Sequence, residues 1–568
     1  MGTCCGPPRC AINNPGTERS LEAVAMNNDT SPFIPVSKKK KLKLFWPCVL
    51  LVSLLAVWFV LQLFGPNPKL RISRETTYIT EPLTNGLPDY DEYVRSKLLD
   101  GLEPENNQSL AIWLELGPEG DDQPNQRVSD AVGIPVSDLK QGRLIPLSDE
   151  RYEDSLTEWL KLHDLKSTPN WIPETDLPDD AMSCVWSSED CPPLAAWMED
   201  NTDVFARLRA ACSMTGNASF AWAYGSQHSL GEVSASRMQR REVARLLAAR
   251  AKWCTGDRRH LDAWNNLKAM HCLGRTDAGN VELVDYLVND AINEMAWTHT
   301  HELLASPNLS VADAEHIRTE LKQLPPRPSL SKCLEGERLF LLSYSINSYD
   351  MASQTSRLTF YREEYDQDLS TLALGTRLDW NVILARHNAR LDEAVRIANI
   401  TDRKTRDESV AEYQDRFASR PLDKSTTRLI GALLSCRARS RIVADWMDPL
   451  DSTISFVFSE NRQSIYPAFA EALALLAISR AEVGEYPDSL NDVVVHGEHV
   501  TIPADFSGLP LQYEKTETGF VLRSLGVDEI VDGRADPFVG DDTVLDTSEQ
   551  AKTIVDVIRT LNILVEEW

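Results

Sequence analysis

The chain has 568 residues, of which 42% are hydrophobic and 25% charged, and these proportions are ordinary for a folded globular protein. At about 100–200 residues per domain, the length predicts two to four folding units. The formal net charge is −27. Because so large an acidic excess repels phosphate backbones, the composition argues against nucleic acid as a partner. The acidic excess fits binding of cationic partners or divalent ions, or it keeps the protein soluble.

The first 45 residues form a separate basic segment. They carry seven Lys or Arg against three acidic residues, a net charge of +4, and residues 1–37 are rich in Pro, Asn, Gly and Ser without apolar periodicity. Because residues 46–64 have no charge, residues 65–568 carry −31. A segment with so few apolar residues cannot bury enough surface to fold, so residues 1–45 are predicted to be a disordered tail.

The strongest signal in the chain is an uncharged apolar run of 19 residues, Trp46–Phe64. About 20 apolar residues span the hydrocarbon core of a bilayer, and no small-residue cleavage site of a signal peptide follows the run. Five lysines precede it and three basic residues follow shortly after it, which favours a cytoplasmic N-terminus. The sequence therefore predicts a signal anchor, with the lipid bilayer as the partner of residues 46–64.

Seven of the eleven cysteines lie beyond the apolar run, and an odd number leaves at least one thiol unpaired or paired between chains. Cys184 and Cys191 could close a short disulfide loop in an oxidising compartment, or remain thiols. Four further cysteines fall within or beside helical patterns and are predicted to be small buried hydrophobes: Cys212, Cys254, Cys272 and Cys436.

Residues 65–192 are predicted to form a stalk followed by a loop-rich region. Residues 66–90 begin with Pro-Asn-Pro and lead away from the apolar run, and residues 117–192 are punctuated by Pro, Asp, Gly and Ser. One clear helix is expected near residues 150–162. We expect the loop-rich part to pack on the main body.

Residues 193–466 are predicted to form a helical array, because apolar residues recur there at three- and four-residue spacing. Ser310 followed by Asp313 predicts a helix start with a side-chain cap. Residues 244–275 resemble a tetratricopeptide-type hairpin, but no 34-residue period continues, so we expect a degenerate α-solenoid. The predicted helices cover residues 194–211, 236–253, 261–272, 281–304, 311–323, 334–345, 369–397 and 424–446.

Residues 467–568 are predicted to form a small α+β module. A helix over residues 467–483 ends at Gly484, and strands are expected over residues 511–514, 520–524 and 543–545, with glycines at the turns. An amphipathic pattern predicts a closing helix over residues 552–567.

The module carries a family likeness. Its segments AISRAEVGEYPDSLNDV, DFSGLPLQY, GFVLRSLGVDEIVDG and DPFVGDDTVL resemble the soluble part of the major pseudopilin of type II secretion. That resemblance implies a helix, a Tyr-Pro turn, a small sheet and an Asp-rich, calcium-binding loop. The anchor here lies far before the module and lacks a prepilin cleavage signal, so filament assembly is not implied.

A second likeness extends over residues 90–350, where NNQSLAIWLELGPE and SLSKCLEGERLFLLS resemble uncharacterised, membrane-anchored helical proteins of bacteria that end in the same module. This likeness implies a cytoplasmic (inner) membrane protein with a periplasmic domain and envelope proteins as partners. It lends the chain no known activity.

Calcium is the ligand that the sequence favours most. Carboxylates on a glycine-bearing loop can supply the six to eight oxygens that calcium prefers, but the spacing does not fit an EF-hand, and a solvated acidic turn fits the pattern slightly better. The candidate ligands are Asp528, Asp532, Asp536, Asp541 and Asp542. The resemblance implies that the last two face the ion.

His299 and His301 invite a metallohydrolase interpretation, but a zincin needs His-Glu-x-x-His, and position 305 is Ala. Two residues apart on a helix, the two side chains point about 200° away from each other. No nucleophile-elbow or phosphate-loop motif occurs in the chain.

The sequence thus predicts a mainly α protein with one transmembrane helix, a helical array and a pseudopilin-like α+β module. The first functional hypothesis is a non-enzymatic scaffold that binds envelope proteins. The alternatives are an unrecognised envelope enzyme with a site between the array and the module, and an accessory component of a type II secretion-like apparatus.

Overall fold

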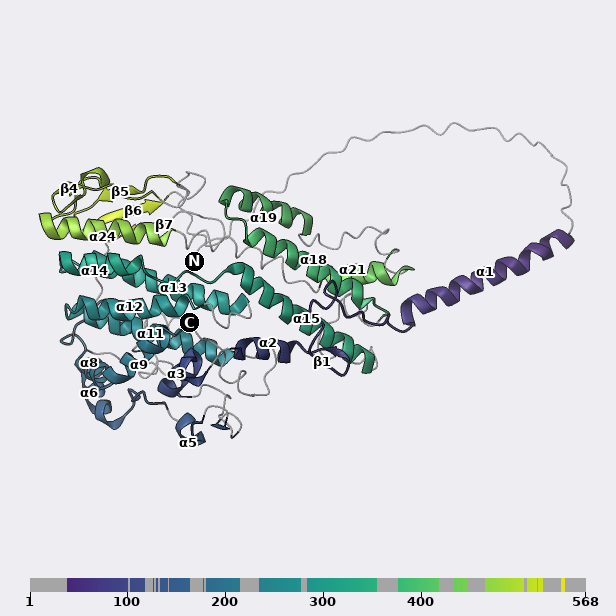
Figure 1. Ribbon diagram of the computed structural model, residues 1–568, viewed down its shortest axis with the longest axis horizontal. Helices are drawn as coiled ribbons and strands as arrows, with labels where there is room; N and C mark the ends of the chain where they lie inside the picture. The colour runs from purple at the N-terminus through teal and green to yellow at the C-terminus, as the bar shows by residue number, and fades with distance from the viewer. Residues whose placement is uncertain are drawn as a thin grey trace, which may run out of the picture. The chain divides into compact units, whose positions relative to one another are not determined.

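Figure 1 shows the computed structural model of the protein, which is mainly helical and has little sheet. The chain divides into two compact units, Met1–Leu61 and Gln62–Trp568. The structure describes residues 38–100, 103–117, 126, 129–130, 133–140, 142–163, 177, 180–214, 234–276, 283–354, 376–417, 431, 434–446, 465–504, 508–517, 519–524 and 543–546. Most of the predicted tail and the predicted closing helix lie outside these residues.

The apolar run forms a helix. Helix α1, Lys38–Phe64, contains the run Trp46–Phe64, and no residue of that run is buried. Among the described residues, it is the one helix long and apolar enough to cross a membrane. Leucines of this run such as Leu50 and Leu54 are more than half exposed, which a soluble helix avoids over so long a stretch.

The segment after the span is packed and does not form the stalk that the sequence predicted. Leu70, Ile79 and Tyr90 are buried in one cluster with Trp380. Strands β1, Leu83–Thr84, and β2, Leu87–Pro88, form a short antiparallel hairpin within it. The Tyr90 hydroxyl donates to the backbone oxygen of Thr77 over 2.6 Å, so backbone groups that a free stalk would expose to water are bonded inside the fold.

This segment joins a first group of helices. Helix α15 packs on α2 and α18, and α18 packs on α19 and α21. The sequence does not predict helix α19, because few of its described side chains are deeply buried. These are Val410 and Tyr413, which belong to one buried cluster with Ile397 of α18. The bounds are α2 Tyr90–Leu99, α15 Leu330–Gln354, α18 Trp380–Ala398, α19 Arg403–Phe417 and α21 Cys436–Trp446.

A second group holds the larger core. Helices α11, α12 and α13 pack in succession, and α13 and α14 pack on α24 (Figure 1). The helices predicted over residues 236–253, 261–272, 281–304 and 311–323 are confirmed, and α11 and α12 form a hairpin where the tetratricopeptide likeness was noted. The bounds are α11 Ser234–Gly256, α12 His260–Gly274, α13 Leu283–Ala305, α14 Val311–Leu321 and α24 Tyr466–Val483.

The helix predicted over residues 194–211 is wrong in one respect, because it is two helices, α8 and α9, separated at Asn201. Asn201 is fully buried, accepts from the Ile145 backbone N–H over 2.9 Å and donates to the Trp197 oxygen over 3.0 Å. A side chain that bonds to backbone groups competes with helix continuation. The bounds are α8 Pro192–Asp200 and α9 Thr202–Cys212.

The loop-rich region packs on this second group. Tyr152, Leu156 and Trp159, from the helix predicted near residues 150–162, share one buried cluster with α8, α9, α11 and α12. The bounds in this region are η1 Pro104–Asn106, α3 Gln108–Leu116, α5 Val136–Leu139 and α6 Glu150–Leu162.

Helix α24 belongs to the same core as α13 and α14, so residue 467 does not mark a packing boundary. Its side chains are apolar almost all round, and Phe469, Leu473 and Leu476 are buried in the cluster of the second group. A helix that is apolar on every side must be covered on every side. It ends at Gly484, as predicted, with φ +96° and its N–H donating to the Arg480 oxygen over 2.7 Å.

The predicted strands of the C-terminal region are confirmed as one antiparallel sheet in the order β5-β6-β7. Phe520 and Leu522 of the central strand are buried, and both lie in the cluster that α24 shares with α13 and α14. The bounds are η2 Leu490–Asp492, β3 Val494–Val495, β4 Glu498–His499, β5 Gln512–Lys515, β6 Phe520–Ser524 and β7 Thr543–Asp546.

Candidate functional site

The five aspartates predicted to hold calcium, Asp528, Asp532, Asp536, Asp541 and Asp542, lie outside the described residues. The calcium site therefore remains a prediction. Within the described ranges, no group of three or more His, Cys, Asp or Glu side chains is arranged to hold a metal ion.

His299 and His301 face different surroundings, as their spacing on one helix predicted. His299 Nδ1 lies 2.9 Å from Glu302 Oε2, and Glu302 is also paired with Lys252 of α11. Burial raises the pKa of Glu302, but the His299 hydrogen bond and the Lys252 charge outweigh it and lower the pKa to about 2. This group joins α11 to α13.

His301 lies in an aromatic cluster between α13 and α24. Its ring packs against Trp297, Tyr466 and Phe469, with centroid distances of 5.9–6.2 Å. Burial lowers the pKa of His301 to about 4, so the ring is neutral at pH 7. At His301, the contact between the array and the C-terminal region is therefore a packed aromatic cluster.

The described cysteines beyond the span are mostly buried. Cys184 and Cys191 carry free thiols, and burial raises their pKa to about 11 and about 12. Such thiols are poor nucleophiles, because the thiolate is the reactive form. Of the cysteines predicted to be small buried hydrophobes, Cys212, Cys254 and Cys436 are buried, and Cys272 is half-buried.

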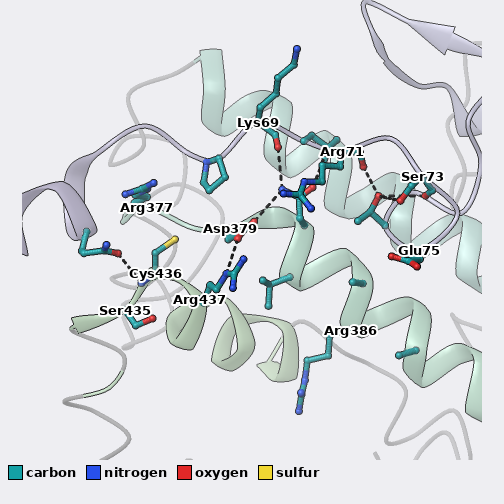
Figure 2. A pocket seen from close by; sticks show the side chains of 18 residues that line it. Lys69, Arg71, Ser73, Glu75, Arg377, Asp379, Arg386, Ser435, Cys436 and Arg437 are labelled. Carbon is teal, nitrogen blue, oxygen red and sulfur yellow. Dashed lines mark hydrogen bonds and ion pairs between the residues drawn. The ribbon is translucent and has the colours of Figure 1, made fainter. Parts of the chain in front are cut away.

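A cavity of about 1140 Å³ lies where the apolar span passes into the helical domain. Its wall comes from three stretches that are far apart in the sequence: residues 62–76, residues 377–389 around the start of α18, and residues 435–437 at the start of α21 (Figure 2). Gln62, in the last turn of α1, is one of the lining residues.

Polar side chains hold these three stretches together. Asn381 accepts from the Arg71 backbone N–H over 2.7 Å and donates to the Lys69 oxygen over 3.1 Å. Gln62 Oε1 accepts from the Cys436 backbone N–H over 3.3 Å. The start of α18 and the start of α21 are thereby bonded to the chain that leaves the span.

The cavity is cationic. It is lined by five basic and two acidic side chains, whereas residues 65–568 as a whole carry −31. The basic residues are Lys69, Arg71, Arg377, Arg386 and Arg437, and the acidic ones are Glu75 and Asp379.

The charges differ in how they are neutralised. Asp379 is nearly buried, and its carboxylate lies 3.7 Å from Arg437 Nε, while Arg386 Nε lies 2.6 Å from Asp445. Lys69 and Arg71 are exposed and form no ion pair with a described residue. These two side chains leave positive charge at the rim, and Glu75, which is also exposed and has no ion-pair partner among the described residues, offsets part of it.

None of the described side chains that line the cavity is an activated nucleophile. Burial raises the pKa of Cys436, although the charges of Arg377 and Arg439 oppose this effect, so the thiol stays protonated at neutral pH. Among the described residues that line the cavity there is no histidine to act as a general base for Ser435.

Sequence reasoning missed this site. Lys69 and Arg71 are two of the three basic residues that follow the span and indicate its orientation, and Arg377 and Arg437 lie more than 300 residues further along the chain. The available signal was a few basic residues directly after the span in an otherwise acidic domain.

No family model, curated protein or solved structure matches this chain. The likeness of residues 467–546 to a pseudopilin therefore continues to rest on the sequence motifs and the order of elements.

Proposed function

We propose that this protein is a single-pass, membrane-anchored scaffold whose helical domain binds other proteins of a bacterial envelope. The observation that carries the proposal is the apolar helix Trp46–Phe64, which has no buried residue and leads directly into a packed segment. A helix of this length and composition suits a bilayer, and no described residue of the run is buried. The basic tail favours an orientation with the N-terminus in the cytoplasm and the acidic domain in the periplasm.

The scaffold role is supported by the packing of successive helices, because helical arrays use their extended surfaces for protein binding. An enzyme with a site between the array and the C-terminal region is less well supported, because Trp297 and Tyr466 stack at that contact with ring centroids 6.0 Å apart. The order of helix, glycine stop and three-stranded sheet supports the accessory secretion role as a second candidate.

Anchoring and orientation are tested together. Alkaline carbonate washing of membranes should leave the protein in the pellet, and protease added to spheroplasts should digest the domain while sparing the tail. Release of the protein by carbonate would contradict the membrane anchor. Protection of the domain from protease would show the opposite orientation.

Binding is tested by photo-crosslinking in native membranes. A photoreactive amino acid at exposed apolar positions of α12 and α13, Leu261 and Val284, should yield adducts of discrete mass. Leu162, at the end of α6 and 78% exposed, is the matched control. Patterns identical to that of Leu162, or no adducts, would contradict the scaffold; secretion proteins in the adducts would favour the second candidate.

A further inference from the structure

We infer that the cationic cavity binds the phosphate headgroup of an anionic membrane phospholipid. The inference rests on the proposed membrane anchoring and adds a ligand to it. Its basis is the meeting of three features in one place: unpaired basic side chains, the starts of two helices, and the end of the apolar span.

The position of the cavity follows from the covalent chain. Gln62 belongs to the span Trp46–Phe64 and also lines the cavity, and Lys69 follows a few residues later in the same wall. If the span crosses the bilayer, its last turn lies at the level of the lipid headgroups, because the hydrocarbon core is about 30 Å thick and the headgroup layers border it directly. The cavity wall therefore begins at the height where lipid phosphates are found.

The charge of the cavity fits a phosphate. Lys69 and Arg71 are exposed and have no ion-pair partner among the described residues, so their charges are available to a ligand. Arginine presents several N–H donors that match phosphate oxygens, and lysine supplies a compact charge. Asp379 does not cancel this charge, because it is nearly buried and lies beside Arg437.

The N-terminal ends of two helices add to the positive electrostatic potential of the cavity. Helix α18, 19 residues long, and helix α21, 11 residues long, both begin at the cavity wall, at Trp380 and Cys436. The first turn of a helix carries partial positive charge from N–H groups without helical partners, which favours an anion. In a domain of net charge −31, these features occur together at the end of the span.

A free phosphate would use the same chemistry, so the source has to be distinguished. A phospholipid headgroup remains attached to its acyl chains in the bilayer, and a site at the headgroup level receives it at high local concentration. A soluble anion has no such advantage. The membrane-proximal position therefore favours the lipid.

The test is native mass spectrometry of the full-length protein in detergent mixed with defined phospholipids. Wild-type protein should retain phosphatidylglycerol in clear preference to phosphatidylcholine. The double variant Lys69→Gln/Arg71→Gln should bind phosphatidylglycerol roughly thirtyfold more weakly, from about 1 kcal/mol for each basic side chain at an anionic surface. The control Lys140→Gln/Lys161→Gln removes two exposed lysines outside the cavity and should bind as wild type.

Each contrary outcome has a definite meaning. Equal retention of the two lipids, or equal binding by the Lys69→Gln/Arg71→Gln variant, would overturn the inference. Displacement of phosphatidylglycerol by millimolar inorganic phosphate would show that the cavity binds a free anion, and would overturn the inference that its ligand is a phospholipid. Because both substituted side chains are exposed, the variant should keep the wild-type melting temperature. Carbonate extraction of the same variant separates a failure of anchoring, seen as release, from a failure of lipid binding.

Discussion

The side-chain amide of Asn388, within α18, donates a hydrogen bond of 2.7 Å to the backbone oxygen of Thr76, 312 residues earlier in the chain. The same amide donates to the Glu75 oxygen over 3.2 Å. Both Asn388 and Thr76 are buried. One side chain thus satisfies two backbone acceptors in the segment that leaves the span, and that segment forms part of the cavity wall.

Replacing Asn388 with alanine should destabilise the packing of the segment around Glu75 and Thr76 against α18. The change leaves the Glu75 and Thr76 oxygens without their donor, which costs about 1–3 kcal/mol for a buried group. Limited trypsin digestion followed by mass spectrometry should show faster cleavage after Arg74. Asn399→Ala, at the end of the same helix, removes only a local bond to the Val395 oxygen and serves as the control. Equal cleavage of the two variants would contradict the role of Asn388.

Replacing Trp297 with alanine should destabilise the whole domain and not only its C-terminal part. Trp297 is 2% exposed and stacks on Tyr466 of α24. Loss of a buried tryptophan costs about 3–5 kcal/mol. Thermal unfolding of the full chain should show one transition at a lower temperature. The control is Val483→Ala on α24, the helix of Tyr466, at a position that is 62% exposed. Its free energy of unfolding should stay within about 0.5 kcal/mol of the wild-type value. Two separate transitions would show that α24 folds with an independent module.

Stability should fall as the pH drops below about 6.5. Burial lowers the pKa of His271 to about 3, with the charge of Arg275 adding to the effect, and burial lowers the pKa of His301 to about 4. An unfolded histidine takes up its proton near pH 6.5, so the unfolded state binds more protons below that pH and the folded state loses stability as acid is added. The melting temperature should therefore be lower at pH 5 than at pH 7.5.

Two variants test whether His271 contributes to this loss of stability at low pH. His271→Gln should show a smaller loss between pH 7.5 and 5, because the side chain no longer titrates. His316→Gln, at a side chain 50% exposed, should keep the wild-type decline. Glu302, whose pKa is about 2, does not titrate in this window. Identical pH dependence in both variants would rule out His271 as a source.

Replacing Gly256 with alanine should destabilise the turn between α11 and α12. A Cβ atom there would lie 2.0 Å from the Trp186 backbone oxygen, so one of the two backbones must move. Overpacking of this kind costs about 1–3 kcal/mol or more. Gly431→Ala is the matched control, because no atom of the described residues lies within 4 Å of a Cβ atom at that position. Equal melting temperatures for the two variants would contradict the close approach.

The sequence by itself determined the elements whose signals are local. The span is visible because its 19 residues are uncharged, and most helices of the second group are visible because apolar residues recur every three or four positions. The start at Ser310, whose side chain accepts from the Asp313 N–H over 3.1 Å, and the stop at Gly484 were also predictable. Each of these features depends on residues within a few positions of one another, and the spacing itself carries the information.

Only the tertiary structure decided how those elements are used. The break at Asn201 depends on Ile145, and the packing of the segment after the span depends on Asn388. The cationic cavity combines Lys69 with Arg437, and no period or motif relates residues so far apart in the chain. Long-range partners are chosen when loops close and apolar surfaces are buried together, so a local sequence pattern does not contain them.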